Sequence, residues 1–296
     1  MVVVGVDVGG TKIAGEVVAR DCSSLASADL PTPVHGPELL EAVAGLVERL
    51  RAGSPEPVVA VGVGIPSLID SRTGRVAMSA NVDLADVDVV GILGARLGLP
   101  VAVDNDANVA ALAESRIGAG RGRGDIVMLT LGTGVGGGVI VDGRIFHGGS
   151  GTGAELGHMV VQADGPPCQR NCPNHGCLET MASGTAIARD AGMPAEEVVR
   201  LATAGDPNAL EVLARSGRYL GVGLASLANI FNPDAFVIGG GAAAAGEFVL
   251  GPARAEYRAR ALPPNAQADV LPAALGPAAG AIGAALIAWD LVDRDG

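Results

Sequence analysis

The sequence predicts an α/β protein of two domains, and three observations support this. The chain has 296 residues, enough for two domains that each bury a core of their own. Short apolar strands alternate with amphipathic helices over residues 1–117. A strand, glycine turn and strand near the N-terminus recur after residue 124. We therefore expect two similar α/β halves with a cleft between them and a glycine-rich turn on each wall.

The first half, residues 1–117, is predicted to be the smaller domain. Its elements are two short apolar strands over 2–7 and 12–19, a helix over 37–51, a buried strand over 57–64, a strand over 101–104, and an alanine-rich helix ending near Ile117. The first two strands form a hairpin, since only a glycine-rich turn separates them.

The second half, residues 118–276, is predicted to be the larger domain, and a basic, glycine-rich joint over 118–124 opens it. Its elements are a strand pair over 125–131 and 136–142, helices over 195–204 and 209–230, and a strand over 235–238. A closing helix over 277–293 is expected to join the smaller domain.

Composition narrows the classes of function. The chain carries 20 Lys and Arg against 32 Asp and Glu, a formal charge of −12. Such a chain repels nucleic acids and anionic membranes, so we expect small-molecule partners. The N-terminus has no basic segment followed by a long apolar one, which predicts a cytoplasmic protein. The uncharged run 270–289 contains Pro272 and Pro277 among glycines, which favours a buried terminal helix over a membrane span.

Three glycine-rich turns follow apolar strands, at 8–11, 132–134 and 239–241. Missing Cβ atoms let backbone N–H groups approach a phosphate, and Asp7 adds a carboxylate at the end of the first strand. The spacing matches neither the P-loop nor the Rossmann motif, but the three turns together predict nucleotide binding.

Two residues beside these strand ends each have a structural and a functional reading. Asp106 comes between a strand and a helix, so it could serve as the helix N-cap or point into a site. Lys12, the only lysine of the chain, could reach a nucleotide phosphate or be a solvated turn residue.

One histidine and three clustered cysteines suit a tetrahedral zinc ion: His158, Cys168, Cys172 and Cys177. The alternatives are a lone polar histidine beside free thiols, or His175 as the fourth ligand. Cys22, His35 and His147 have no partners in spacing and are interpreted as structural or surface residues.

At these residues the chain resembles the ROK family of bacterial sugar kinases and sugar-responsive repressors, within the actin-like ATPase superfamily. The resemblance implies a two-domain actin-like ATPase (ribonuclease H-like) fold with an interdomain cleft. It rests on five motifs in the family's order: Asp7–Lys12, Asn105–Asn108, Leu131–Gly138, Glu155–His158 and Cys172–Glu179.

The resemblance also implies roles for individual residues. Asp106 would be the catalytic base, and the sugar hydroxyls would contact Asn81, Asn105, Asp106, Glu155, His158 and Glu179. The resemblance implies ATP phosphates on the turns Gly9–Thr11 and Gly132–Gly134. Together with the residues that the glycine turns themselves indicate, the predicted site for ATP and Mg²⁺ comprises Asp7, Gly9, Gly10, Thr11, Lys12, Gly132, Thr133, Gly134, Gly239, Gly240 and Gly241. A structural Zn²⁺ would bind His158, Cys168, Cys172 and Cys177. The family commonly spaces its first two cysteines as C-x-C, whereas three residues separate Cys168 from Cys172 here.

The implied activity is ATP-dependent phosphorylation of a hexose hydroxyl, with glucose converted to glucose 6-phosphate. N-acetylmannosamine, mannose, fructose and N-acetylglucosamine are alternative substrates, and the family suggests a homodimer or homotetramer. Two other classes compete, a sugar-sensing repressor and an assembling actin-like ATPase. The acidic charge and the absence of helices before the first strand argue against the repressor. The predicted sugar contacts argue against the ATPase.

Overall fold

The computed structural model describes residues 1–33, 36–70, 72–79, 84–169 and 172–295. The chain folds into two compact units that exchange segments. The first contains Met1–Gly118, Arg144–Ala154 and Pro277–Gly296, and the second contains Ala119–Gly143 and Glu155–Gly276. Strands and helices occur in both units, which confirms the predicted α/β class.

The first unit is built on a five-stranded sheet in the order β3-β2-β1-β4-β7. Its strands are β1 (Val2–Val8), β2 (Lys12–Val18), β3 (Ser24–Pro31), β4 (Val58–Ile65) and β7 (Val101–Asn105). The first three strands form an antiparallel meander, whereas β1, β4 and β7 run parallel. The carboxyl ends of these three parallel strands therefore meet at one edge of the sheet.

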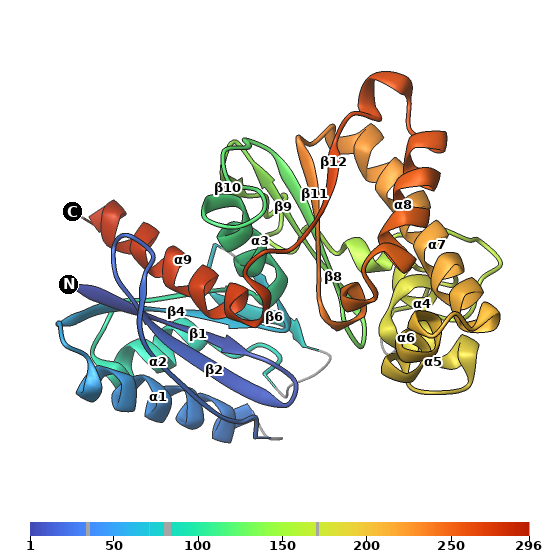
Figure 1. Cartoon of the computed structure of the whole chain (residues 1–296). Helices are drawn as coiled ribbons and strands as arrows, with labels where there is room; N and C mark the ends of the chain where they lie inside the picture. Colours follow the sequence, from blue (N-terminus) through green and yellow to red (C-terminus); the bar gives the residue numbers. More distant parts are fainter. Residues whose placement is uncertain (34–35, 71, 80–83, 170–171, 296) are drawn as a thin grey trace. The chain divides into compact units, whose positions relative to one another are not determined.

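Helices and short strands complete the first unit: α1 (Gly36–Gly53), β5 (Ser67–Asp70), β6 (Arg75–Ser79), α2 (Val89–Leu97), α3 (Asp106–Arg116), β10 (Arg144–Ile145) and α9 (Ala279–Asp295). Figure 1 shows α9 lying along β1 and β4. The approach is close, because a Cβ on Gly5 or Gly62 would lie 2.0 or 1.7 Å from a carbonyl oxygen of α9. Glycines in the strands thus let the terminal helix dock.

Four strands of the second unit lie next to one another in one sheet, in the order β9-β8-β11-β12. Its strands are β8 (Ile126–Leu131), β9 (Val135–Val141), β11 (Ala235–Gly239) and β12 (Asp269–Pro272). The hairpin β8–β9 is antiparallel, so the predicted recurrence of the opening hairpin is present, and β11 runs parallel to β8.

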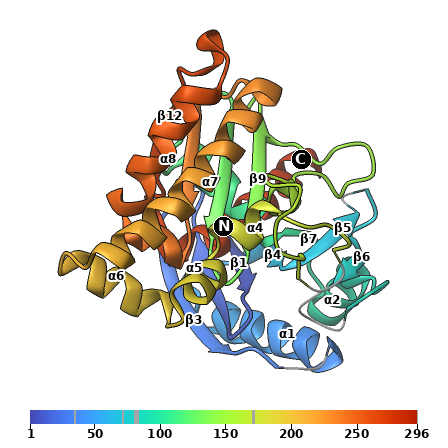
Figure 2. The same cartoon turned by 90° about the vertical axis from the view of Figure 1, so that its right-hand side faces the viewer.

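The remaining elements of the second unit are helical: η1 (Leu156–His158), α4 (Leu178–Ala182), α5 (Gly184–Ala191), α6 (Ala195–Thr203), α7 (Pro207–Phe231), η2 (Gly241–Ala245), α8 (Glu247–Arg260), η3 (Pro263–Asn265) and η4 (Gly276–Ala278). Figure 2 shows α7 and α8 side by side. Gly217 and Gly221 of α7 face carbonyl oxygens of α8 that a Cβ would clash with, at 2.3 and 2.5 Å, so the two helices pack closely.

The uncharged run 270–289 is divided among β12, the 3₁₀ turn η4 and the first part of α9. Ala281, Ala284, Ala285 and Ala288 of α9 are buried, so the predicted buried terminal helix is confirmed. It begins two residues after Pro277, because η4 occupies Gly276–Ala278. Within the described ranges, no helix is both long enough and apolar enough to cross a membrane.

Candidate active site

Acidic residues gather at the carboxyl ends of the parallel strands in the first unit. Asp7 of β1 is in register with Gly64 of β4, and Gly64 is in register with Asp104 of β7. A Cβ on Gly64 would lie 3.6 Å from Asp7 Oδ1 and 3.5 Å from the Cα of Asp106. Glycine is required at this position because a Cβ would lie only 2.8 Å from Val109 Cγ2 of α3, so Gly64 lets α3 and Asp106 approach β4 and Asp7.

Asp106 is the first residue of α3, and the helix is capped by its neighbour. The side chain of Asn105 accepts hydrogen bonds from the backbone N–H groups of Ala107 and Asn108, at 2.9 and 3.2 Å. The interpretation of Asp106 as the N-cap is therefore wrong, because Asn105 occupies that position. The Asp106 carboxylate accepts one bond, from Ala107 N at 2.9 Å, and is available for other chemistry.

Burial makes these carboxylates poor acids. The pKa of Asp7 is raised from 3.8 to about 7, first by desolvation and then by the charge of Asp106, against an opposing effect of Lys12. Burial also raises the pKa of Asp106, which the bond from Ala107 N partly offsets. A carboxylate with a raised pKa is a stronger base, as proton abstraction from a hydroxyl requires.

The raised pKa of Asp7 predicts that stability falls as the pH rises. Between pH 3.8 and about 7 the folded protein keeps a proton that the unfolded chain has lost, which lowers the free energy of unfolding. At about 1.4 kcal/mol per pH unit, the titration of Asp7 lowers the free energy of unfolding by up to about 2 kcal/mol between pH 5.5 and 8. Asp7→Asn should abolish that loss. Urea unfolding in EDTA at both pH values measures it, and an equal loss in the variant contradicts the prediction.

The first glycine turn is a tight connection whose tip is exposed. Gly9 N donates to Lys12 O at 2.9 Å, and Thr32 Oγ1 donates to Gly9 O at 2.7 Å. Gly10 has no atom within 4 Å of a built Cβ, so its backbone is open to a ligand. The Lys12 side chain is exposed, yet its charge lowers the pKa of Asp7, so the ammonium acts on the carboxylate cluster.

His147, interpreted from sequence as partnerless, has a partner. Its Nε2 lies 2.6 Å from Oδ2 of Asp104 at the end of β7. The two residues are 43 positions apart, so no local spacing could reveal the pair. Asp104 and His147 are the site-adjacent residues that sequence reasoning missed.

The second unit has a cavity of about 630 Å³ beside its glycine turns. Gly184 N donates to Gly132 O at 2.8 Å, and Thr185 Oγ1 donates to Thr133 O at 2.7 Å, so the turn after β8 is fastened to the start of α5. The cavity is lined by Gly132, Thr133, Gly184, Thr185, Ile187, Ala188, Pro194, Ala195, Glu196, Val199, Gly241, Ala242 and Ala244. Of the turn after β11, it is Gly241 that reaches the cavity.

Gly240 and Gly239 support that cavity rather than line it. Gly240 has a φ of +86°, and a Cβ there would lie 2.5 Å from Leu131 O at the end of β8. Only glycine suits this combination of a left-handed backbone and close approach. Gly239 ends β11 against the Met128 side chain.

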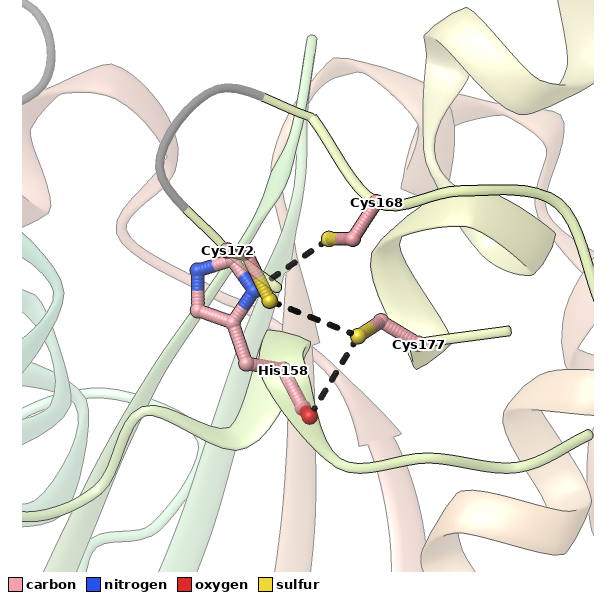
Figure 3. Close-up of side chains that lie close together, drawn as sticks. All are labelled: His158, Cys168, Cys172 and Cys177. Carbon is pink, nitrogen blue, oxygen red and sulfur yellow. Dashed lines mark hydrogen bonds between the residues drawn. The ribbon is translucent and has the colours of Figure 1, made fainter. Parts of the chain in front are cut away.

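The predicted histidine and cysteines come together in the second unit. The ligand atoms of His158, Cys168, Cys172 and Cys177 all lie within 4.8 Å of one another, and Figure 3 shows the four side chains converging. Cys172 Sγ is 3.9 Å from Cys177 Sγ, and Cys168 Sγ is 3.5 Å from His158 Nδ1. Two sulfurs of a tetrahedral zinc site are about 3.8 Å apart, so the donor set fits this ion.

The cysteine cluster is followed in the chain by Glu179, a residue predicted to bind the sugar. Cys177 is the N-cap of α4, and Glu179 lies in the first turn of that helix. Glu179 Oε2 accepts a bond from Val135 N at 3.0 Å, and a Cβ on Gly134 would lie 2.2 Å from the same oxygen. Gly134 is therefore required for the carboxylate to approach the turn after β8.

Glu155 and His158 lie at the two ends of a single 3₁₀ turn. His158 Nδ1 faces Cys168, whereas Nε2 is 4.0 Å from Glu155 Oε2. His175 is exposed and is not part of the Cys and His group found among the described residues. Asn81 lies outside the described residues.

The chain is similar to known proteins over nearly its whole length. The model of the ROK family matches residues 3–290. A glucokinase of Streptomyces coelicolor is 38% identical over 310 residues, which cover 96% of each chain. A xylose repressor of Bacillus spizizenii is 28% identical over 291 residues, covering 95% of this chain and 75% of the repressor.

A solved structure extends the likeness to the whole fold. The crystal structure of a ROK family glucokinase from Streptomyces griseus, in complex with glucose and AMPPNP, has a TM-score of 0.86 at 36% identity and covers 98% of this chain and 100% of that one. The predicted actin-like ATPase fold is therefore confirmed. The sequence motifs, the fold and the family model agree, and the chain belongs to the ROK family.

Proposed function

We propose that this protein is an ATP-dependent sugar kinase that phosphorylates a hexose hydroxyl, with glucose converted to glucose 6-phosphate. The observation that carries the proposal is Asp106, a carboxylate with a raised pKa at the start of α3 that helix capping does not need. The 38% identity to a glucokinase over nearly the whole chain supports the same activity.

Asp106 is assigned the role of general base. The sugar hydroxyl oxygen attacks the γ-phosphorus, its proton passes to the Asp106 carboxylate, and the bond from the γ-phosphorus to the bridging oxygen breaks to release ADP. Asn105 keeps its predicted sugar contact as a proposal: its Oδ1 caps α3 and one Nδ2 hydrogen is donated to Ser67 O at 3.2 Å, so the contact would use the second Nδ2 hydrogen. Mg²⁺ would neutralise phosphate charge when bound, with Asp7 nearby through water.

The cavity of the second unit suits the nucleoside of ATP. Its walls are mainly small and apolar, and Thr133 and Glu196 are among its few polar side chains. The N–H groups of Gly9 and Gly132 already donate to Lys12 O and Gly134 O, so the phosphates would use the N–H groups of the residues that follow in each turn. Gly241 is assigned to the nucleotide because it lines the cavity, and Gly239 and Gly240 through the close packing that shapes it.

A structural zinc ion on His158, Cys168, Cys172 and Cys177 would supply no reaction step and would order the loop. With Nδ1 facing the thiols, His158 keeps Nε2 for a sugar hydroxyl on the side of Glu155. Glu179 would use its second oxygen in the same way, because Oε2 already accepts from Val135 N. Asn81 keeps its predicted sugar contact as a proposal.

A coupled assay of ADP release over a panel of sugars tests the function. We expect release that depends on glucose, with mannose, fructose, N-acetylglucosamine and N-acetylmannosamine slower. ADP release without sugar would favour an actin-like ATPase, and sugar binding without ADP release would favour a sensor related to the repressors. The predicted domain boundaries, the cytoplasmic location and a homodimer or homotetramer remain proposals.

Lys12→Ala is expected to raise the KM for ATP or lower kcat by about ten- to a hundredfold. The reason is the loss of a charge-assisted contact to a phosphate, worth about 1.5–3 kcal/mol. Steady-state kinetics in ATP at saturating sugar measure it, with Arg49→Ala as an exposed cationic control on α1. Unchanged kinetics would show that Lys12 is only a solvated turn residue and does not contact a phosphate. Because Lys12 is the only lysine, an amine reagent can label only it and the N-terminal amine, and peptide mapping should show that ATP protects Lys12.

A further inference from the structure

We propose that His147 is a positioning residue, and that its ion pair with Asp104 holds the Asn105–Asp106 turn in the geometry that the base requires. The inference rests on the proposed kinase function, and it concerns residues to which neither the motifs nor the comparisons assign a role. Asp104 Oδ2 lies 2.6 Å from His147 Nε2.

The other oxygen of Asp104 holds the segment that carries the base. Oδ1 accepts from Asn105 N at 2.7 Å and from Asn108 Nδ2 at 2.9 Å. One carboxylate thus ties the end of β7 to the first turn of α3, on both sides of Asp106 in sequence. A shift of this carboxylate would move the backbone from which Asp106 projects.

The charge of Asp104 needs a counterion. Its side chain is only 9% exposed, and an ionised carboxylate so buried is costly unless it is paired. The His147 imidazole, 29% exposed, supplies the cation and the donor together. With His147 removed, the Asp104 carboxylate would lose the contact that fixes its Oδ2, so its hold on Asn105 and Asn108 through Oδ1 would loosen and Asp106 between them would shift.

The loop that carries His147 is built to hold the ring in place. Gly153 N donates to His147 O at 2.9 Å, and a Cβ on Gly153 would lie 2.9 Å from the same oxygen. The segment from His147 to Gly153 is therefore closed on itself by a glycine that cannot be replaced without movement. The ion pair fastens this closed loop to β7.

The charged groups that act on the imidazole come from two elements. Asp104 of β7 raises the pKa of His147, chiefly through the hydrogen bond, whereas burial and Arg294 of α9 lower it. From α3, Asn108 contributes a neutral amide to the other oxygen of Asp104. The ion pair is complete below the ordinary pKa of 6.5 and is lost as the pH rises through the raised value.

Three variants test the proposal: His147→Ala, His147→Arg, and Arg96→Gln as a matched control. Arg96 forms an exposed ion pair with Glu48 in the same unit. His147→Ala should lower kcat by about 10- to 100-fold with little change in the KM for ATP, as expected when the base is misplaced. His147→Arg keeps a permanent cation, so it should recover most of kcat and remove the loss of kcat that the proposal predicts for wild type at alkaline pH. Arg96→Gln should match wild type.

Normal kcat and an unchanged pH profile in folded His147→Ala would overturn the proposal, as would failure of His147→Arg to alter the alkaline limb. If His147→Ala does not fold, the alkaline pH profile of His147→Arg still tests the proposal.

NMR titration of the four histidines separates this inference from the kinase assignment, because it needs no turnover. The pKa of His147 should be raised in wild type and fall in Asp104→Asn. If the pKa of His147 does not fall in Asp104→Asn, the ion pair is overturned even in an active kinase. If wild type shows no sugar-dependent turnover, the kinase assignment is overturned, and with it this role of His147 in catalysis.

Discussion

Asp106→Asn is expected to lower kcat by about 10²–10⁴-fold while the protein stays folded, the range that general base catalysis contributes. The amide has the size of the carboxylate but cannot take the proton of the attacking hydroxyl. Folding should be retained because Asn105 caps α3, so the helix does not depend on the Asp106 charge. Asparagine at position 106 should even stabilise the metal-free protein, because the buried carboxylate has a desolvation cost, which also raises its pKa, and the neutral amide avoids it. Steady-state kinetics at saturating glucose and ATP measure the loss.

Asp88→Asn is the matched control for this prediction. Asp88 also begins a helix of the first unit, where it caps α2 by accepting from Gly91 N at 2.9 Å. Asparagine caps as well as aspartate, so this variant should keep both stability and kcat. Near-normal turnover in folded Asp106→Asn would contradict the assignment of Asp106 as the general base.

Cys177→Ser is expected to release the metal and to weaken sugar binding strongly. Protein purified without added metal should hold about one equivalent of zinc per chain, because a closed site of three cysteines and one histidine binds tightly. Cys177 is fully buried and is the N-cap of α4, so its loss should displace Glu179. We expect at most about 0.1 equivalent of zinc and a rise of at least tenfold in the KM for glucose, in line with the effect of disturbed metal sites. Elemental analysis and kinetics on one preparation measure both.

Cys22→Ser is the control, since Cys22 lies in the first unit and outside the cluster. It should keep zinc and activity. Metal-free protein with full activity would end the zinc assignment. Cys168→Ser tests the unusual spacing separately: with its Sγ 3.5 Å from His158 Nδ1, we expect zinc to be lost. Zinc retained in that variant would make His175 or water the better fourth ligand.

Much of the fold follows from local patterns in the sequence. The hairpin of β1 and β2, its recurrence as β8 and β9, and the helices α1, α6 and α7 were predicted within about three residues of their bounds. Apolar periodicity and glycine turns are properties of neighbouring residues, so they are visible without the fold. The short elements β5, β6, β10, α4 and β12 were not predicted, because a few residues carry too little periodicity. The longer elements β3, α2, α5 and α8 were not predicted either.

The metal cluster was also predictable, whereas the environment of the base was not. Thiols and an imidazole within 20 residues of one another, at metal-ligand spacing, indicate their chemistry without a structure. The capping of α3 by Asn105, the approach of Glu179 to Val135 and the pairing of Asp104 with His147 depend on contacts 2, 44 and 43 residues apart. The direction of the Asn105 side chain determines the cap of α3. The contact of Glu179 with Val135 and the pair of Asp104 with His147 form only when distant parts of the chain fold together. The sequence was therefore sufficient to predict which chemical groups the protein has and in which elements they lie, but their pKa values and partners depend on burial and on distant segments that meet only in the folded chain.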